Sequence, residues 1–282
     1  MTPTPATIIQ TAEIPSIPHV LQQILSLADN PNTTGTQLEH IVSQEPALVT
    51  QLLKWVNSAY YSLPRRVSSI SHAMILLGFS TVKSIASGLM LINAFADMPQ
   101  ADKDFVNSVW THTLIAANFS KILTAREALG KQDDIFLAAM IHDVGYIVLR
   151  SYFGKKHLDL SDASPFPSPQ EEQEVLGTNH VEIGTELLKQ WRFPEEVIEL
   201  VRCHHQASGY TGPKKDVTYL ILSDLLSFEP QIGDFLNEPE SSMDVGFLQL
   251  LALIGWDWPR LQAARQKFLD AEDIIKKLFT QV

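Results

Sequence analysis

The stretch IFLAAMIHDVGYIVL, from Ile135 to Leu149, contains only two ionisable side chains before Tyr146, and these are His142 and Asp143. Apart from Tyr146, the other residues are apolar or glycine, so the pattern predicts a buried helix from Ile135 to Arg150 with the His–Asp pair in its middle. An isolated buried carboxylate is costly unless it is paired, hydrogen-bonded or bound to a metal. Asp143 therefore needs partners. For this pair alone, a buried hydrogen bond between His142 and Asp143 is the simpler explanation.

Further metal-type side chains occur in apolar helical contexts elsewhere in the chain. They are His112 in WTH, His180 in NHVEIG, His204 and His205 in CHH, and Asp224 in ILSDLL. Adjacent residues on a helix point about 100° apart, so the pairs HD and HH can bind two neighbouring metals, or one metal and a supporting group. Imidazole nitrogen with carboxylate oxygen suits zinc, iron or manganese, and a carboxylate can bridge two ions. Together with His142 and Asp143, these residues predict a convergent site for one or two transition-metal ions; a structural His/Asp core without metal is the alternative.

The residues on both sides of this stretch predict a succession of helices. In the first hundred residues the helix-terminal signals are Pro18, a capping box of Thr36 with Glu39, Pro46, the N-cap residues Ser69 and Ser80, and a stop at Gly78. A longer helical pattern from Asp104 to Leu123 carries Trp110 and His112, and later patterns cover residues 181–190, 195–205, 217–228, 247–253 and 258–279. No strand-like alternation competes with these patterns. We therefore expect an all-α protein.

A different composition marks residues 159–174. Pro165, Pro167 and Pro169 alternate there among Ser and five acidic residues, with no basic residue. Such a segment predicts an exposed loop or lid, in which Ser168 before Pro169 caps a short helix. Residues 1–13 show no apolar periodicity and are expected to form a flexible N-terminal arm.

The composition excludes several classes of protein. At 282 residues and 31.5 kDa, with 45% apolar and 19% charged residues, the chain is long enough for one globular domain of two lobes. The formal net charge of -11 argues against general nucleic-acid binding. The most apolar stretch, Ile85 to Ala96, is shorter than the roughly 20 residues that span a bilayer, and no Lys or Arg precedes Lys54, so we expect neither a membrane span nor a secretory signal. The single cysteine, Cys203, suits a reducing cytoplasm and excludes a Cys-rich zinc module.

The order H…HD…H…HH…D resembles the HD superfamily of metal-dependent phosphohydrolases, above all the HD-GYP cyclic-dinucleotide phosphodiesterases, over about residues 105–228. The resemblance implies that one ion is held by His112, His142, Asp143 and Asp224. It implies that a second ion is completed by His180, His204 and His205. In an enzyme of this kind the ions lower the pKa of a bridging water and clamp the phosphate, with Asp143 as bridge and base.

The sequence upstream resembles the HDOD family, the HD-related output domain of bacterial signalling proteins. The matching segments are IPSIPHVLQQILSL, from Ile14, and EPALVTQLLKWVNSAYYSLPRRVSSISHAMILLGFSTVKSIA, from Glu45, and the likeness covers about residues 14–210. It implies a helical lobe packed on an HD-type lobe, and a regulatory output whose catalytic residues are variably lost. The expected divisions are an N-terminal helical lobe at 14–100, an HD-like lobe at 101–228 and a C-terminal helical extension at 229–282.

Two departures from the HD enzymes concern the handling of phosphate. Many HD hydrolases have Lys after HDxG, whereas HDVGY puts Tyr146 there. The stretch HHQASGYTGP, from His204, lacks the Glu, the Asp and the intact GYP of the HD-GYP pattern. Because the metal-type residues persist, the resemblance favours a regulator with a metal centre and little or no hydrolysis. A metal-dependent phosphohydrolase acting on a nucleotide or another phosphate ester is the alternative.

The two functions predict different working surfaces. A regulator should bind a protein partner mainly through the helical lobe before residue 100, while a nucleotide or phosphate ligand is compatible with either function. A hydrolase needs a cation near the ions, for which the candidates are Lys155, Lys156 and Arg202. Four further histidines are expected at the surface, namely His19, His40, His72 and His157. Cys203 is expected to be a small buried hydrophobe, and Asn57 to cap a helix end.

Overall fold

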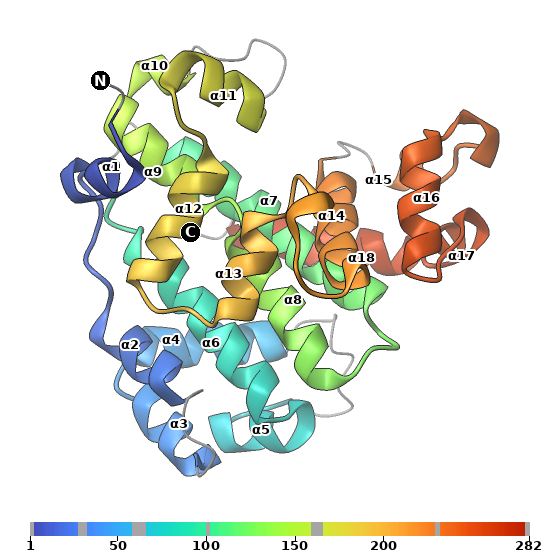
Figure 1. The fold of residues 1–282 in the computed structure, drawn as a ribbon. Coiled ribbons are helices and arrows are strands. Elements are labelled where there is room, and N and C mark those ends of the chain that lie inside the picture. Colours follow the sequence, from blue (N-terminus) through green and yellow to red (C-terminus); the bar gives the residue numbers. More distant parts are fainter. Residues whose placement is uncertain are drawn as a thin grey trace.

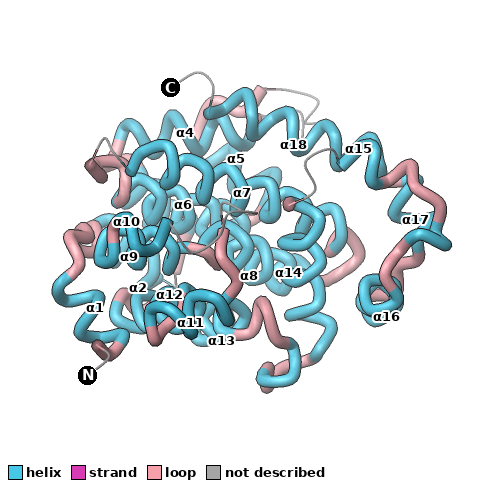
Figure 2. The backbone as a smooth tube through the Cα atoms, turned by 90° about the horizontal axis from the view of Figure 1, so that it is seen from above, coloured by secondary structure: helices cyan, strands magenta, loops and turns pink. Residues whose placement is uncertain are grey.

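The computed structural model describes residues 3–27, 33–57, 66–99, 102–158, 166–228 and 232–279, and within these ranges it contains helices and no strand (Figure 2). The first helices are α1 (Pro5–Thr11), α2 (His19–Ser26), α3 (Gly35–Val42), α4 (Pro46–Val56), α5 (Ile70–Leu77), α6 (Phe79–Ala94), α7 (Lys103–Leu123), α8 (Leu129–Ile141) and α9 (Val144–Phe153). The later helices are α10 (Lys155–Leu158), α11 (Pro169–Leu176), α12 (His180–Gln190), α13 (Glu195–Arg202), α14 (Lys214–Ser227), α15 (Ile232–Phe235), α16 (Val245–Leu253), α17 (Trp258–Ala263) and α18 (Arg265–Phe279). The prediction of an all-α fold is confirmed.

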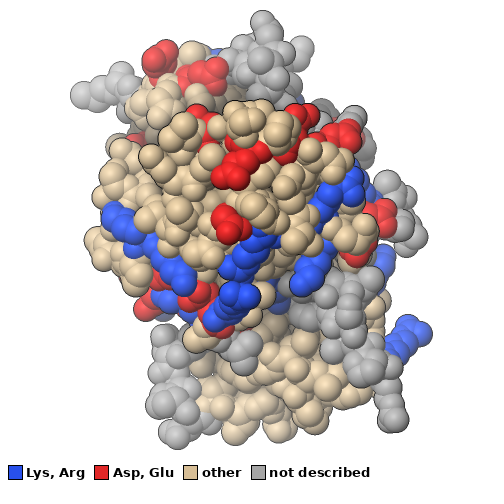
Figure 3. All heavy atoms as spheres, turned by 90° about the vertical axis from the view of Figure 1, so that its right-hand side faces the viewer, with Lys and Arg blue, Asp and Glu red and all other residues tan. Residues whose placement is uncertain are grey.

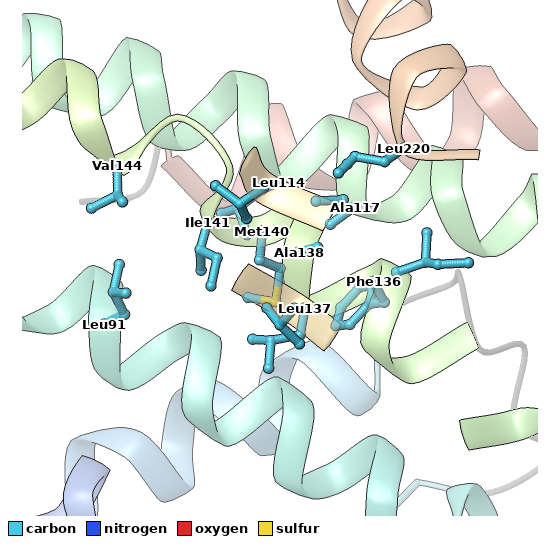
Figure 4. Close-up of a cluster of buried hydrophobic side chains, with 14 of the residues drawn as sticks. Leu91, Leu114, Ala117, Phe136, Leu137, Ala138, Met140, Ile141, Val144 and Leu220 are labelled. Carbon is cyan, nitrogen blue, oxygen red and sulfur yellow. The ribbon is translucent and has the colours of Figure 1, made fainter. Parts of the chain in front are cut away.

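Helix α8 lies at the centre of the fold and contacts α6, α7, α13 and α14 (Figure 1). Its side chains Phe136 and Met140 are buried in one cluster with Leu114 of α7, Leu91 of α6 and Leu220 of α14 (Figure 4). Burying an aliphatic or aromatic side chain of this size stabilises the fold by roughly 1.5–3 kcal/mol. Since α6 also packs against the N-terminal helices α2, α4 and α5, this core joins the N-terminal helices to α7, α13 and α14.

A second contact between the N-terminal helices and the later helices involves two aromatic rings. Phe95, which follows α6, stacks on Trp191, which follows α12, with ring centroids 6.1 Å apart and planes 25° apart. Trp191 is only 7% exposed. The prediction that Trp191 is an anchoring core residue near the end of its helix is confirmed.

The predicted continuous helix from Ile135 to Arg150 is wrong, because the backbone breaks at the His–Asp pair. Helix α8 ends at Ile141, helix α9 begins at Val144, and His142 and Asp143 form the turn between them. The residues of both helices around the turn are buried on all sides. Apolar residues therefore continue across the break, and the hydrophobic pattern contains no sign of it.

Most predicted helix ends in the first hundred residues are observed. Pro46 lies in the first turn of α4, Ser69 caps α5 by accepting from the backbone N–H of His72, and Gly78 ends α5 with a φ of 90°. Asn57 caps the end of α4 and also bonds the backbone of Val67 through both its amide atoms.

Two predicted N-caps are wrong. The capping box of α3 pairs Thr34 with Gln37, two residues before the predicted pair, because Thr34 and Thr36 offer the same hydroxyl and the helix begins at Gly35. Helix α6 begins directly after Gly78, so Ser80 lies inside the helix. In the acidic segment, the predicted cap is confirmed: Ser168 forms a capping box with Glu171 at the start of α11.

The prediction of a flexible arm over residues 1–13 is wrong for Pro5–Thr11. These residues form α1, capped by Thr4, and the helix contacts α12 and α9. Ile8 is fully buried and Ile9 is 7% exposed. A helix of this length presents only two adjacent apolar side chains, too few for periodicity to be visible in the sequence.

The C-terminal helices return to the core. Helix α18 packs on α7, where Phe268 meets Phe119 with ring centroids 4.8 Å apart, and α16 contacts α14 (Figure 1). The predicted helix over 258–279 is divided into α17 and α18.

One stretch of the described residues, Lys131–Phe153, is long and apolar enough to cross a membrane by length and composition alone. It comprises most of α8 and all of α9, and 89% of its most apolar window is buried inside the protein.

Candidate metal centre

The structure brings the seven predicted residues together from five parts of the chain. His112 lies in the middle of α7, His142 and Asp143 lie between α8 and α9, His180 is the first residue of α12, His204 and His205 follow α13, and Asp224 lies near the end of α14. They form two groups, and within each group the candidate ligand atoms all lie within 4.8 Å of one another. The first group is His112, His142, Asp143 and Asp224, and the second is Asp143, His180, His204 and His205.

In the first group, two imidazoles face two carboxylates. Nε2 of His112 lies 3.0 Å from Oδ1 of Asp224 and 3.3 Å from Oδ2 of Asp143. Nε2 of His142 lies 3.3 Å from each of the same two oxygens. The two nitrogen and two oxygen atoms thus surround one point.

In the second group, three imidazoles surround the other oxygen of Asp143. Nε2 of His204 lies 3.5 Å and Nε2 of His180 lies 3.7 Å from Oδ1 of Asp143, and Nε2 of His205 lies 3.0 Å from Nε2 of His180. Oδ2 of Asp143 faces the first group and Oδ1 faces the second. Asp143 therefore stands between the two groups as a bridging carboxylate would.

Hydrogen bonds behind the imidazoles fix their orientation. Nδ1 of His142 bonds the carbonyl oxygen of Ala139 at 2.9 Å, and Nδ1 of His204 bonds that of Val201 at 2.6 Å. Because a carbonyl only accepts, Nδ1 donates in both residues. The Nε2 atom of each is left to face the centre, as in metal-bound histidines.

Unsatisfied atoms in the centre fit a metal ion. Nε2 of His142 and Nε2 of His204 are buried and have no hydrogen-bond partner among the described residues. Each nevertheless lies beside a carboxylate oxygen, at 3.3 and 3.5 Å respectively. A buried polar atom without a partner is unfavourable, and a cation between nitrogen and oxygen satisfies both. Both groups are therefore able to bind a metal.

The electrostatics of the centre follow from burial and mutual contact. Burial opposes a charge on Asp143, yet His142, His112 and His204 hold the pKa of its carboxyl well below the usual range. Against the opposite effect of burial, Asp143 and Asp224 raise the pKa of His112 and His142. Burial lowers the pKa of His180 to about 3, so this imidazole is neutral at pH 7. The raised pKa values favour a proton on His112 and on His142 opposite the two carboxylates, and a cation bound there would supply the same balancing charge.

The centre is closed to solvent except at one residue. The exposed fractions of His112, His142, Asp143, His180, His204 and Asp224 are between 0 and 5%, whereas His205 is exposed. The rings of Phe228 and Phe166 cover His112, at centroid distances of 4.1 and 5.4 Å. His205 also lines a surface cavity of about 700 Å³, together with Arg202.

Gly145 of the HDVGY motif allows two helices to cross closely. A Cβ atom at Gly145 would lie 1.9 Å from the carbonyl oxygen of His180 and 2.8 Å from the backbone nitrogen of Gly184. Both atoms belong to α12, which packs against α9. The glycine thus lets the first turn of α12 carry His180 up to Asp143.

Tyr146 occupies the position where many HD hydrolases have Lys. Its ring stacks on His180 with centroids 3.9 Å apart and planes 20° apart, and its hydroxyl donates to the carbonyl of Pro167 at 2.6 Å. Burial raises the pKa of Tyr146 well above its usual range, so the side chain is neutral. It supplies no positive charge to a phosphate.

The three basic side chains that could meet a phosphate have different surroundings. Arg202 binds both carboxylate oxygens of Glu199 and the carbonyl of Gly209. Lys156 is exposed, with Nζ 5.9 Å from the ring of Phe153, and the side chain of Lys155 lies outside the described part of the structure. Cys203 is 1% exposed, as predicted for a small buried hydrophobe.

Two residues that contact the centre from behind, and a third that holds one of them, were not predicted from the sequence. Glu172 bonds Nδ1 of His180, and Oγ of Ser227 lies 3.0 Å from Nδ1 of His112. His157 bonds Glu172 and is only 1% exposed, so its prediction as a surface residue is wrong. His19 and His40 are exposed as expected. No local signal identifies Glu172 or His157, because Glu172 lies in an acidic run and His157 follows two lysines.

The comparisons with known proteins agree with this architecture. A family model described as "HDOD domain" matches residues 14–207. An uncharacterized protein of Treponema pallidum (strain Nichols) is 28% identical over 203 residues, which cover 68% of this chain but only 38% of that protein. The "Putative phosphohydrolase" of Shewanella amazonensis SB2B has a TM-score of 0.74 at 19% identity, covering 96% of this chain and 97% of that chain. The "Putative signal transduction protein" of Marinobacter aquaeolei VT8 has a TM-score of 0.67 at 25% identity, covering 99% of this chain and 61% of that chain.

The fold and the site define an HD-type all-α protein with a paired His/Asp centre. Because the family model matches more than half of the sequence, the chain belongs to the HDOD domain family.

Proposed function

We propose that this HDOD protein is a bacterial signalling regulator that acts through a protein partner in the cytoplasm, with a metal-loaded His/Asp centre and little or no hydrolysis. The observation that carries the proposal is the closure of the centre: six of its seven residues are at most 5% exposed. A phosphate ester needs access to the ions and a positive group beside them. Aromatic rings from Phe166, Phe228 and Tyr146 lie against His112 and His180 instead.

Under this proposal, the two groups hold one or two ions of zinc, iron or manganese. The first ion is held by His112, His142, Asp143 and Asp224, and the second by Asp143, His180, His204 and His205. When bound, such ions supply positive charge that offsets the buried carboxylates, and they lower the pKa of a coordinated water. The protein's own groups fix the donors in place, and the aromatic cover excludes bulk water.

A hydrolysis assay tests the proposal. The metal-loaded protein is incubated, with added Mn²⁺ or Fe²⁺, with a chromogenic phosphodiester, a cyclic dinucleotide and a nucleoside triphosphate, and the Asp143→Ala variant serves as control. We expect the wild-type protein to release no more product than the variant. Metal-dependent turnover that disappears in Asp143→Ala would contradict the proposal.

The alternative function, a metal-dependent phosphohydrolase, is favoured by one observation. His205 is exposed and lines a cavity of about 700 Å³ that also contains Arg202 and Lys189. A small phosphate ester has room there, at the one open side of the second group. The assay above decides between the two functions, since only this alternative predicts turnover.

The proposed partner surface lies on the N-terminal helices. On α5, Ile75 is 80% exposed and the adjacent Leu76 is 44% exposed. Figure 3 shows Lys and Arg side chains gathered in a band across the middle of one face, while the described residues at its lower end, where the N-terminal helices lie, are mostly uncharged. Exposed apolar side chains on an uncharged surface are typical of protein-binding sites.

Photocrosslinking in cells tests this surface. A photoreactive amino acid is placed at position 75, and at position 245 as control, because Val245 is also exposed, at 67%, but lies on the C-terminal helix α16. We expect a protein adduct from position 75. An adduct that forms only from position 245 would contradict the assignment.

A further inference from the structure

Glu172 is a buried acid within an exposed acidic helix. On α11, Glu171 and Glu174 are exposed, whereas Glu172 is 0% exposed. A carboxylate is rarely buried completely unless specific groups compensate its charge.

The compensating groups are two imidazoles and one backbone N–H. Oε2 of Glu172 accepts from Nδ1 of His180 at 2.6 Å and from the backbone N–H of His180 at 2.8 Å. Oε1 of Glu172 lies 3.1 Å from Nε2 of His157, which is 1% exposed. His180 begins α12, where a backbone N–H has no partner within the helix, so Glu172 satisfies the helix start and the ring together.

This contact determines which nitrogen of His180 faces the centre. With Nδ1 donating to Glu172, the lone pair of Nε2 points toward Asp143 and His205. The stacked ring of Tyr146, 3.9 Å away, limits rotation of the imidazole. The hydrogen bonds and the stacking together hold His180 in the orientation that metal coordination needs.

The two groups differ in what lies behind their histidines. In the first group, Nδ1 of His112 contacts the hydroxyl of Ser227, and Nδ1 of His142 bonds the carbonyl of Ala139. Among the described residues, His180 of the second group has a carboxylate in that position. A carboxylate behind a ligating imidazole makes the imidazole a stronger donor, and its removal typically lowers metal affinity 10–100-fold.

We infer that Glu172, held by His157, is a positioning residue that controls metal binding at the second group and leaves the first group independent. The inference rests on the proposed metal centre. Through His180, Glu172 connects α10 and α11, which carry His157 and Glu172, to the second group, and among the described residues its hydrogen bonds reach no ligand of the first group.

Metal binding by matched variants tests the inference. Zn²⁺ affinity and stoichiometry are measured by competition with a chelator for the wild type, for Glu172→Gln and for Ser227→Ala, and the visible absorption of Co²⁺-loaded samples is compared. We expect two ions in the wild type. Glu172→Gln should weaken the binding of one ion 10–100-fold and change its Co²⁺ spectrum, while the affinity for the other ion stays unchanged. Ser227→Ala should lower the affinity for that other ion.

Three results overturn the inference. If the wild type binds no metal, the proposed centre fails and the inference fails with it. If the wild type binds metal and Glu172→Gln binds it equally well, or loses both ions equally, only the inference fails. Should Glu172→Gln not fold in the absence of metal, Glu172→Asp provides the same comparison, since the shorter side chain keeps the charge but not the contacts with both imidazoles.

Discussion

Asp143 is the residue on which both groups depend, because one of its oxygens faces each group. We predict that Asp143→Ala destabilises the protein as well as emptying the centre. Removing this carboxylate leaves buried imidazoles or ions uncompensated, and breaking such a buried set costs on the order of 3–5 kcal/mol. Thermal melts with and without a chelator measure the effect. An unchanged melting temperature in both the variant and the chelated wild type would refute it.

The sequence predicts the seven candidate ligand residues better than the residues behind them. The seven are recognisable because His and Asp are unusual in apolar stretches. Glu172 and His157 have no such contrast, since Glu172 lies in an acidic run and His157 follows two lysines. Their burial arises only when α10 and α11 fold over α9 and α12, and this tertiary contact has no local signature.

Helices α9 and α12 cross at Gly145 and Gly184, and the crossing sets the position of His180. We predict that Gly145→Ala destabilises the protein by roughly 3 kcal/mol and weakens metal binding at the second group. The reason is that the new Cβ would lie 1.9 Å from a backbone oxygen, which can move only with α12. Urea unfolding and metal titration measure the two effects.

Gly88→Ala is the matched control for this crossing. Its Cβ would also be crowded, at 2.6 Å, but against Cε at the flexible end of Met140. We expect a smaller loss of stability and unchanged metal affinity. A Gly145→Ala variant no less stable than Gly88→Ala would show that the crossing tolerates a side chain.

The packing of α7 on α8 predicts a pH dependence of stability. Lys121 of α7 is 8% exposed, and Nζ lies 4.1 Å from the ring centroid of Phe136. Burial lowers the pKa of Lys121 from 10.5 to about 8, partly opposed by Asp133. The unfolded chain then binds more protons between these values, so stability should rise as the pH increases from 8 to 10.5. At about 1.4 kcal/mol per pH unit, the full rise is on the order of 3 kcal/mol.

Lys121→Met removes the titrating group while keeping an unbranched apolar side chain. Unfolding free energies of both proteins are measured at pH 7.5 and pH 10, and the difference between the proteins isolates Lys121 from the other groups that titrate. We expect the free energy of unfolding of the wild type to increase relative to that of the variant between pH 7.5 and pH 10. An equal change in both proteins would mean that folding does not lower the pKa of Lys121.

At the scale of elements, helices with strong signals are predicted and interruptions are not. Proline at the start of α4, serine at the N-cap of α5 and glycine at its end each have a local physical cause, and all three are observed. The break at His142 and Asp143 has no local cause in the sequence, because both neighbouring helices are buried on every side. Helix α1 is stabilised by its contacts with α9 and α12 rather than by its own sequence.

In the whole molecule, the N-terminal helices are joined to the later helices by one core through α6 and α8 and by a second contact through Phe95 and Trp191. The metal-type residues all lie after α6, while the exposed Ile75 and Leu76 lie on α5. The expectation of two helical lobes comes from the chain length and from the resemblance to the HDOD family, while apolar periodicity predicts only the helices themselves. The sequence does not predict the covering of the centre by Phe166, which precedes α11, and by Phe228, which caps the end of α14, since the positions of both depend on the packing of the whole chain.

The proposed function depends most directly on metal in the His/Asp centre. The decisive measurement is anomalous scattering at the zinc, iron and manganese edges from crystals of protein purified without a metal-affinity tag, with elemental analysis of the same sample. We expect one or two peaks, each among the ligand atoms of one group and, if the ion is zinc, about 2.0–2.2 Å from the nearest of them. No anomalous peak, in a sample that contains no transition metal and takes none up, would contradict it and leave a His/Asp polar core without metal.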